Sequence, residues 1–167
     1  MFPKPRADLT PNSAAFENTP QVKPTGFREY DARWRYPQEI NLMGLQALGL
    51  GLGTYLHDSG IEPKIVVGHD YREYSMAVKM ALINGLMAAG CTVHDIGLSL
   101  SPMAYFAQFA LDVPAVAMVT ASHNDNGWTG VKMGAARPLT FGPDEMGALK
   151  TLVLEGRYRL KSGGSHT

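Results

Sequence analysis

The sequence predicts a three-layer α/β domain in which a mostly parallel, mixed sheet has helices on both faces. Three observations support this fold class. Short apolar runs, typical of buried strands, alternate with longer segments of helical length. Glycine or polar residues follow the apolar runs, and 167 residues is about the length of one domain. Because strands and helices that alternate in this way form βαβ units, most of the strands are expected to be parallel.

The helices are indicated by their length, their apolar spacing and their end signals. The segment 38–58 has apolar residues at helical intervals, with several glycines that are expected to allow close packing on the sheet. The segment 73–90 closes on Gly90, and the segment 101–112 has Pro102 in its first turn, positions at which these residues are common. A last helix is expected over residues 145–156.

The strands are indicated by short runs rich in β-branched and other apolar residues. "KIVVGHD" (64–70), "CTVHDIG" (91–97) and "AVAMVT" (115–120) each fit a buried strand that leads into a loop. A further short strand is expected around "VKMGA" (131–135). These runs lie between the predicted helices, so the order of elements is that of a doubly covered sheet.

The two ends of the chain differ from the middle in composition. Residues 1–24 contain five of the 11 prolines among polar residues, which predicts a flexible N-terminal arm. The domain itself is expected to occupy residues 25–157. The tail 158–167 ends in glycine and serine, and is interpreted as the start of a linker to a second domain that this chain lacks.

The overall composition excludes some classes of partner. The 15 basic and 15 acidic residues cancel, so no overall field favours nucleic acid or an anionic membrane. Cys91 is the only cysteine, which rules out an internal disulfide. There is no apolar run of about 18 residues and no leader-like N-terminus, so the expected location is the cytoplasm.

Polar segments follow three of the predicted strands. "GHDYRE", "SLSP" and "TASHN" lie at the carboxyl ends, where ligands bind in sheets of this kind, so they should line one rim. Ser122 and His123 are adjacent and make a poor nucleophile–base pair, and there is no G-x-S-x-G elbow. On composition alone, this segment could equally be a polar surface loop.

Four sequence motifs, taken together and in their order along the chain, resemble those of a known family. "TASHN" is followed by "GVK" with its lysine ten residues after Ser122, and "FREYDAR", "GHDYREYS" and "SLSPMAYFA" precede it. Together they resemble the α-D-phosphohexomutases, and within them the bacterial phosphomannomutase/phosphoglucomutase group. The resemblance covers about residues 26–156, which correspond to the first of the family's four domains. Phosphoglucosamine mutase, from the same superfamily, is a weaker match.

The resemblance implies a mutase that interconverts hexose 1-phosphate and hexose 6-phosphate of mannose or glucose. A phosphoserine at Ser122 would exchange its phosphoryl group with the sugar through a hexose 1,6-bisphosphate, which also acts as activator. Lys132 would be the general base, and His123 a further catalytic group. One Mg²⁺ would bind through the phosphate on Ser122. The phosphate- and substrate-binding positions implied are Tyr30, Arg33, Arg72 and Asn124.

Several positions depart from the family pattern. Asp125 stands where proline is usual, His69 where arginine is usual and Thr129 where asparagine is usual, and "YDARW" replaces "YDIRG". No two aspartates are spaced i, i+2, so the family's D-G-D-x-D metal loop is absent from this chain. The chain is therefore interpreted as the N-terminal part of a longer enzyme, inactive by itself. The expected partner is a small-molecule hexose phosphate, with the oligomeric state left open.

Other interpretations stay open or are excluded. A non-catalytic phosphosugar-binding or regulatory module would also keep these motifs. Arg72, taken alone, would more often pair with Asp70 or Glu73 than bind a ligand, and Trp128 fits packing as well as substrate stacking. "GLGLGTY" is not a dinucleotide-binding signal, because it lies inside a predicted helix and lacks the G-x-G-x-x-G spacing.

Overall fold

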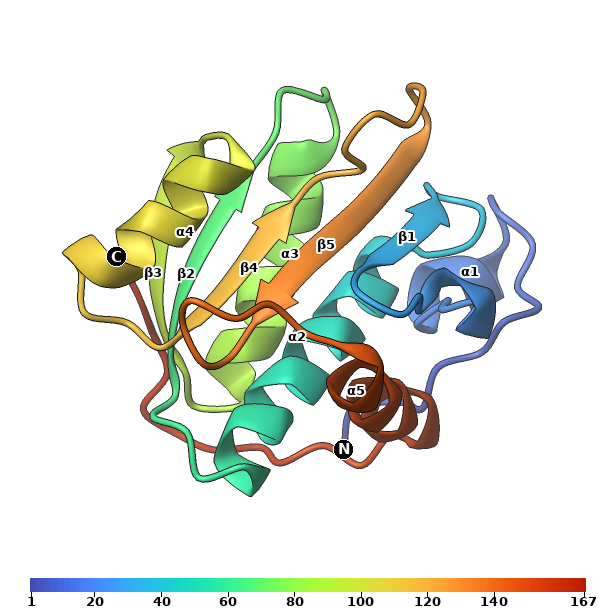
Figure 1. Ribbon diagram of the computed structural model, residues 1–167. Helices are drawn as coiled ribbons and strands as arrows, with labels where there is room; N and C mark the ends of the chain where they lie inside the picture. The colour runs from blue at the N-terminus through green and yellow to red at the C-terminus, as the bar shows by residue number, and fades with distance from the viewer.

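The computed structural model describes residues 1–167, and its centre is one six-stranded sheet (Figure 1). The strand order across the sheet is β1-β5-β4-β2-β3-β6. β2 pairs in parallel with β3 and β4, and β3 pairs in parallel with β6, whereas β5 is antiparallel to both β4 and β1. The bounds are β1 (Ala32–Arg35), β2 (Lys64–His69), β3 (Thr92–Leu98), β4 (Ala115–Val119), β5 (Trp128–Gly134) and β6 (Ser165–His166).

Helices cover both faces of this sheet, which confirms the predicted fold class (Figure 1). The helices α2 and α3 lie behind the sheet in Figure 1, and α4 lies in front of β2 and β3. The main hydrophobic core joins α2, α3 and α5 to the sheet, and a second, smaller core lies under α4. The bounds are α1 (Ala14–Asn18), α2 (Leu42–Asp58), α3 (Ser75–Ala88), α4 (Ser101–Ala110) and α5 (Pro143–Glu155), with a 3-10 turn at Pro24–Gly26.

The glycines of α2 serve a contact between helices, not the contact with the sheet that was expected. A Cβ built on Gly49 would lie 2.1 Å from the carbonyl oxygen of Leu82 in α3. In the reverse direction, a Cβ on Gly85 of α3 would lie 2.0 Å from the carbonyl oxygen of Gln46. The two backbones approach so closely that no side chain fits between them. Helix α2 is consequently buried on nearly all sides.

The N-terminal segment 1–24 packs on the domain, whereas a flexible arm was expected. Leu9, Phe16 and Val22 are buried, although they are separated by prolines and polar residues in the sequence. The buried amide of Asn41 binds this segment: its Nδ2 donates to the carbonyl of Phe16 at 2.8 Å, and its Oδ1 accepts from the N–H of Gln21 at 2.9 Å. The burial of these three apolar side chains and the hydrogen bonds of Asn41 therefore offset the conformational entropy that the segment loses when it becomes ordered.

The C-terminal tail also differs from the expected linker. Ser165 and His166 form β6, which pairs with the edge strand β3 at Thr92 and Val93. The N–H of Thr167 donates to the carbonyl of Val93 at 3.0 Å. A two-residue strand has no sequence signature of its own, and its pairing depends on the free edge that β3 offers.

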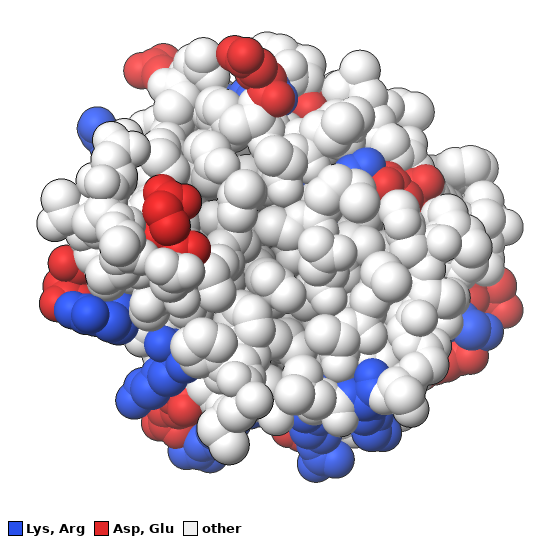
Figure 2. Space-filling model, turned by 180° about the vertical axis from the view of Figure 1, so that it is seen from behind, with Lys and Arg blue, Asp and Glu red and all other residues white.

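The face opposite the view of Figure 1 has few charges at its centre. Figure 2 shows acidic and basic side chains mostly around the periphery, with an uncharged area between them. The exposed side of α3 contributes Met76 and Met80 to the apolar surface of the protein. None of the helices has the length and apolar character that crossing a membrane requires.

Candidate active site

The loops that follow β2, β3 and β4 meet along one edge of the sheet, the upper edge in Figure 1. These strands are neighbours and run in parallel, so their carboxyl ends lie side by side. A hollow of about 390 Å³ lies between the loops. All three motifs line it, and the lining residues include Asp70 and Tyr71 of the first, Ser99 and Ser101 of the second, and Thr120, Ser122 and His123 of the third.

Ser122 has an unusual backbone conformation and an exposed side chain. Its φ of 56° lies in the left-handed region, which few residues other than glycine adopt. The N–H of Ser122 donates to Oγ1 of Thr120 at 2.9 Å, and its carbonyl accepts from Arg72 at 3.3 Å. The hydrogen bonds that hold this residue therefore use its backbone, and the hydroxyl points to the rim without competing for them.

Arg72 lies beneath the loop, where its side chain is 4% exposed. It forms an ion pair with Asp70, one of the two partners that the sequence allowed, and its Nη2 also donates to the carbonyl of Asn124 at 2.5 Å. Burial by itself raises the pKa of Asp70, but the hydrogen bonds that the carboxylate accepts outweigh burial and hold the pKa below its ordinary value. Asp70 is thus the negatively charged partner of Arg72.

Arg33, at the other side of the loop, is tied to both the loop and a carboxylate. Its Nε donates to Asp31 at 2.8 Å, and its Nη1 donates to Oδ1 of Asn124 at 2.7 Å. The same Nη1 lies 3.4 Å from the carbonyl oxygen of Ala121. Asn124 therefore accepts hydrogen bonds from two arginines, one through its side chain and one through its backbone.

A second hollow, of about 250 Å³, contains three more of the predicted site residues. Tyr30, Arg33 and Lys132 line it together with Tyr105 of α4. Lys132 lies on β5 opposite Met118 of β4, and its side chain is half-buried. The structure therefore places Ser122 and His123 in one hollow and Lys132 in another, and Arg33 connects the two.

Three residues of the site were not among the predicted site residues, although Asp70 was named as a possible partner of Arg72. Thr120 and Asp70 have the contacts described above, and the hydroxyl of Tyr74 donates to the carbonyl of Trp128 at 2.7 Å while accepting from the N–H of Gly127 at 2.8 Å. Asp70 and Tyr74 belong to the segment "GHDYREYS" that was recognised. Their spacing around Arg72 was the available signal, but the partners of Tyr74 are backbone groups that residue types do not reveal.

The residues of this chain do not form a Mg²⁺ site by themselves. The structure contains no group of three or more histidine, cysteine, aspartate or glutamate side chains that could hold a metal. Near the loop, Asp31 and Asp70 are already engaged by Arg33 and Arg72. Because Mg²⁺ in proteins is usually bound by carboxylates as well as phosphate oxygens, further ligands would have to come from outside this chain.

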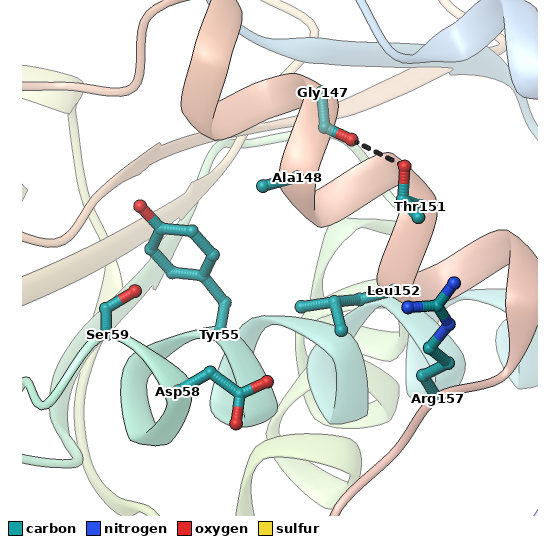
Figure 3. Close-up of a pocket in the computed structure, with 8 residues that line it drawn as sticks. All are labelled: Tyr55, Asp58, Ser59, Gly147, Ala148, Thr151, Leu152 and Arg157. Atoms are coloured by element: carbon teal, nitrogen blue, oxygen red, sulfur yellow. Dashed lines mark hydrogen bonds between the residues drawn. The ribbon is translucent and has the colours of Figure 1, made fainter.

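The chain also has a hollow of about 430 Å³ that is remote from the rim (Figure 3). It lies between the C-terminal end of α2, which contributes Tyr55 and Asp58, and α5, where Oγ1 of Thr151 donates to the carbonyl of Gly147 at 3.1 Å (Figure 3). The end of α2 precedes the amino end of β2 by only a short loop. None of the predicted site residues lies in this hollow.

Comparisons with known proteins identify the family of this chain. Residues 24–159 match the family model described as "Phosphoglucomutase/phosphomannomutase, alpha/beta/alpha domain I". The chain belongs to this family. It corresponds to domain I of the phosphoglucomutase/phosphomannomutases, and this domain is what the fold described above represents.

Relatives of the phosphoglucomutase/phosphomannomutase domain come from several organisms. The chain is 41% identical over 122 residues to a phosphomannomutase of Salmonella typhimurium, covering 71% of this chain and 26% of the relative. It is 38% identical over 112 residues to a Pyrococcus horikoshii protein named "Probable phosphoglucosamine mutase". That match covers 67% of this chain and 24% of the relative. The chain thus spans about a quarter of the length of these relatives.

A solved structure supports the same assignment. The crystal structure of a phosphoglucomutase/phosphomannomutase family protein from Burkholderia thailandensis superimposes with a TM-score of 0.81 at 28% sequence identity. The match covers 88% of this chain and 33% of that one. The three-layer architecture is therefore shared with a phosphoglucomutase/phosphomannomutase over almost the whole chain.

Two departures from the phosphohexomutase motif have structural consequences. His69, in place of arginine, is buried, and its Nδ1 lies 2.8 Å from the carbonyl oxygen of Asp70. Thr129, in place of asparagine, is buried, and its hydroxyl has no hydrogen-bond partner. Neither residue lines the hollow beside Ser122.

Proposed function

We propose that the chain is the phosphoserine-bearing domain of a phosphohexomutase that interconverts hexose 1-phosphate and hexose 6-phosphate of mannose or glucose. The observation that carries this proposal is the state of Ser122. Its backbone is held in the turn while its exposed hydroxyl lines the hollow at the carboxyl ends of the strands. A hydroxyl presented in this way is accessible for phosphorylation and for transfer to a bound sugar.

The reaction proceeds as two phosphoryl transfers. In the first, the bond between phosphorus and Oγ of Ser122 breaks and a bond to the free hydroxyl of the hexose phosphate forms. The proton of that hydroxyl passes to Lys132, while Oγ of Ser122 takes up a proton from solvent, which it loses again in the second transfer. The resulting hexose 1,6-bisphosphate then returns its other phosphate to Ser122. Phosphoryl transfer depends mainly on positioning and on neutralising charge. Arg33 and Lys132 supply positive charge on this side of the sheet.

Turnover is proposed to need more polypeptide than these 167 residues. A phosphate on Ser122 would offer oxygen ligands to Mg²⁺, but the chain contributes no cluster of carboxylates beside it. The hollows at the rim are open, so a bisphosphate would diffuse away before it reoriented. The chain is accordingly expected to take up phosphate slowly and stoichiometrically, and to be inactive in multiple turnover.

A second candidate is a non-catalytic phosphosugar-binding or regulatory module, which would keep the loop of Ser122 without carboxylates for a metal beside it. The two are separated by incubating the protein with glucose 1,6-bisphosphate and Mg²⁺, followed by intact-mass and peptide analysis. The mutase predicts one added phosphate on Ser122 that Ser122→Ala abolishes. Phosphate on another residue, or none at all, would contradict it. A rise in Tm with hexose phosphate but no phosphate uptake would support the second candidate.

A further inference from the structure

We propose that Arg72 is a positioning residue that holds the loop carrying Ser122 by its carbonyl groups, and that it does not bind substrate. What this positioning role means for catalysis rests on the function proposed above, whereas the contacts that support the role do not depend on that function. The resemblance alone placed Arg72 among the phosphate- and substrate-binding residues, so the inference changes its role.

The first support is the pair of carbonyls that Arg72 binds. Its Nη2 lies 3.3 Å from the carbonyl oxygen of Ser122 and 2.5 Å from that of Asn124. These two residues flank His123, so a single guanidinium nitrogen holds both sides of the turn. A planar guanidinium with several N–H donors can make such contacts while also binding a carboxylate, which an ammonium cannot do with the same geometry.

The second support is that the rest of the guanidinium is covered. Its Nη1 is paired with Asp70, which in turn accepts a hydrogen bond from Oγ of Ser75 at 2.6 Å. The guanidinium carbon also lies over the ring of Tyr71, 5.7 Å from the ring centroid. With 4% of its side chain exposed, Arg72 presents almost no surface to a phosphate in the hollow.

The third support is that the same segment holds the far end of the loop. Tyr74, two residues after Arg72, binds Gly127 and Trp128 through its hydroxyl. The residues between β2 and α3 therefore form hydrogen bonds with the loop after β4 near both of its ends. Left-handed conformations persist only where the surroundings determine them, and Ser122 has one. Arg72 contacts the carbonyl of Ser122, and Thr120 accepts from its N–H, so both side chains support this conformation.

The experiment measures amide hydrogen exchange of the loop 121–127 in the 167-residue protein, for wild type, Arg72→Ala and Arg72→Lys. The matched control is Arg137→Ala, because Arg137 also donates to a carbonyl, that of Gln108 at 2.7 Å, and pairs with Asp112, but remote from the loop. Both Arg72 variants should increase exchange in the loop at least tenfold and leave the peptides of β4 unchanged. Arg137→Ala should leave the loop as in wild type.

A second readout separates positioning from substrate binding. If Arg72 positions the loop, Arg72→Lys slows the maximal rate of phosphate uptake from glucose 1,6-bisphosphate and leaves the half-saturating concentration within about twofold. If Arg72 binds phosphate, lysine retains the charge and restores uptake, while alanine raises the half-saturating concentration. Unchanged loop exchange in both variants would overturn the proposal. Absence of uptake in wild type would contradict the proposed function instead, since the exchange experiment does not depend on it.

Discussion

The Nζ of Lys79 on α3 lies 2.5 Å from Oδ2 of Asp95 on β3, and the two side chains are 4% and 14% exposed. This buried ion pair lies at the edge of the sheet where β6 is added. Nε2 of His166 lies 3.2 Å from the same carboxylate oxygen, and the N–H of Gly97 donates to the other oxygen at 2.8 Å. Burial raises the pKa of Asp95, but its hydrogen bonds, first that from Lys79, outweigh burial and lower the pKa below its usual value.

The first prediction concerns this pair. Asp95→Asn leaves the ammonium of Lys79 buried without a countercharge, so the free energy of unfolding at pH 7 should fall by about 3–5 kcal/mol. Urea unfolding measures it, with His166→Asn as a control that should cost less than about 1 kcal/mol.

The pH dependence of that difference follows from the sign of the pKa shift. A carboxylate whose pKa is lowered by folding contributes stability above its unfolded pKa of about 3.9, and the contribution is lost as pH falls through the lower, folded value. The difference between wild type and Asp95→Asn should therefore be constant from pH 5 to 8 and shrink below about pH 4. The same difference at pH 3 as at pH 7 would show that the charge of Asp95 is not involved.

The second prediction tests the crossing of α2 and α3. Gly49→Ala places a methyl group 2.1 Å from the carbonyl oxygen of Leu82, so the helices must separate, and unfolding free energy should fall by about 1–3 kcal/mol. Gly147→Ala on α5 is the matched control, because a Cβ there meets nothing within 4 Å. That substitution should raise stability by up to about 1 kcal/mol through helix propensity. Two variants with equal stability would contradict the close-contact explanation.

The third prediction concerns the backbone at Ser122. Alanine keeps the left-handed strain, whereas glycine relieves it, so Ser122→Gly should be more stable than Ser122→Ala by up to about 1 kcal/mol. Thermal unfolding measures the difference in stability between the two variants. Because neither variant has a hydroxyl at position 122, loss of the hydroxyl does not contribute to that difference. A more stable alanine variant would mean that the turn is not strained.

The fourth prediction concerns Lys132. If it accepts the proton of the sugar hydroxyl, Lys132→Ala should lower the maximal rate of phosphoryl exchange with Ser122 by about 100-fold or more, with a smaller effect on half-saturation. Lys150→Ala on α5 serves as the control for loss of one positive charge. A raised half-saturating concentration with an unchanged maximal rate would make Lys132 a phosphate contact.

Much of the fold was predictable because its central elements have long, regular patterns. The four longer helices and β2, β3 and β4 lie within a few residues of where periodicity and end signals placed them. The strand β1 was missed because only two of its four residues, Ala32 and Trp34, alternate as buried positions. Short elements such as α1 and β6 depend on tertiary partners and have no comparable pattern.

The site was predictable in location but not in detail. The carboxyl ends of three strands identified the rim, and Ser122 and His123 lie there as expected. The contacts of Arg72 with the loop and those of Tyr74 were not predictable, because they go to carbonyl and N–H groups whose directions depend on a left-handed turn. Residue type indicates which hydrogen bonds a side chain can donate, but the backbone conformation of the loop determines which acceptors lie within reach.

The left-handed φ of Ser122 also bears on which alcohol this turn can present. A β-branched residue is a steric outlier at a φ of 56°, because its second substituent on Cβ crowds the neighbouring backbone. Threonine offers the same nucleophilic oxygen as serine, but it would strain the turn or force the loop to rearrange. The shape of the backbone, before any chemistry takes place, therefore selects a primary alcohol over a secondary one at this position.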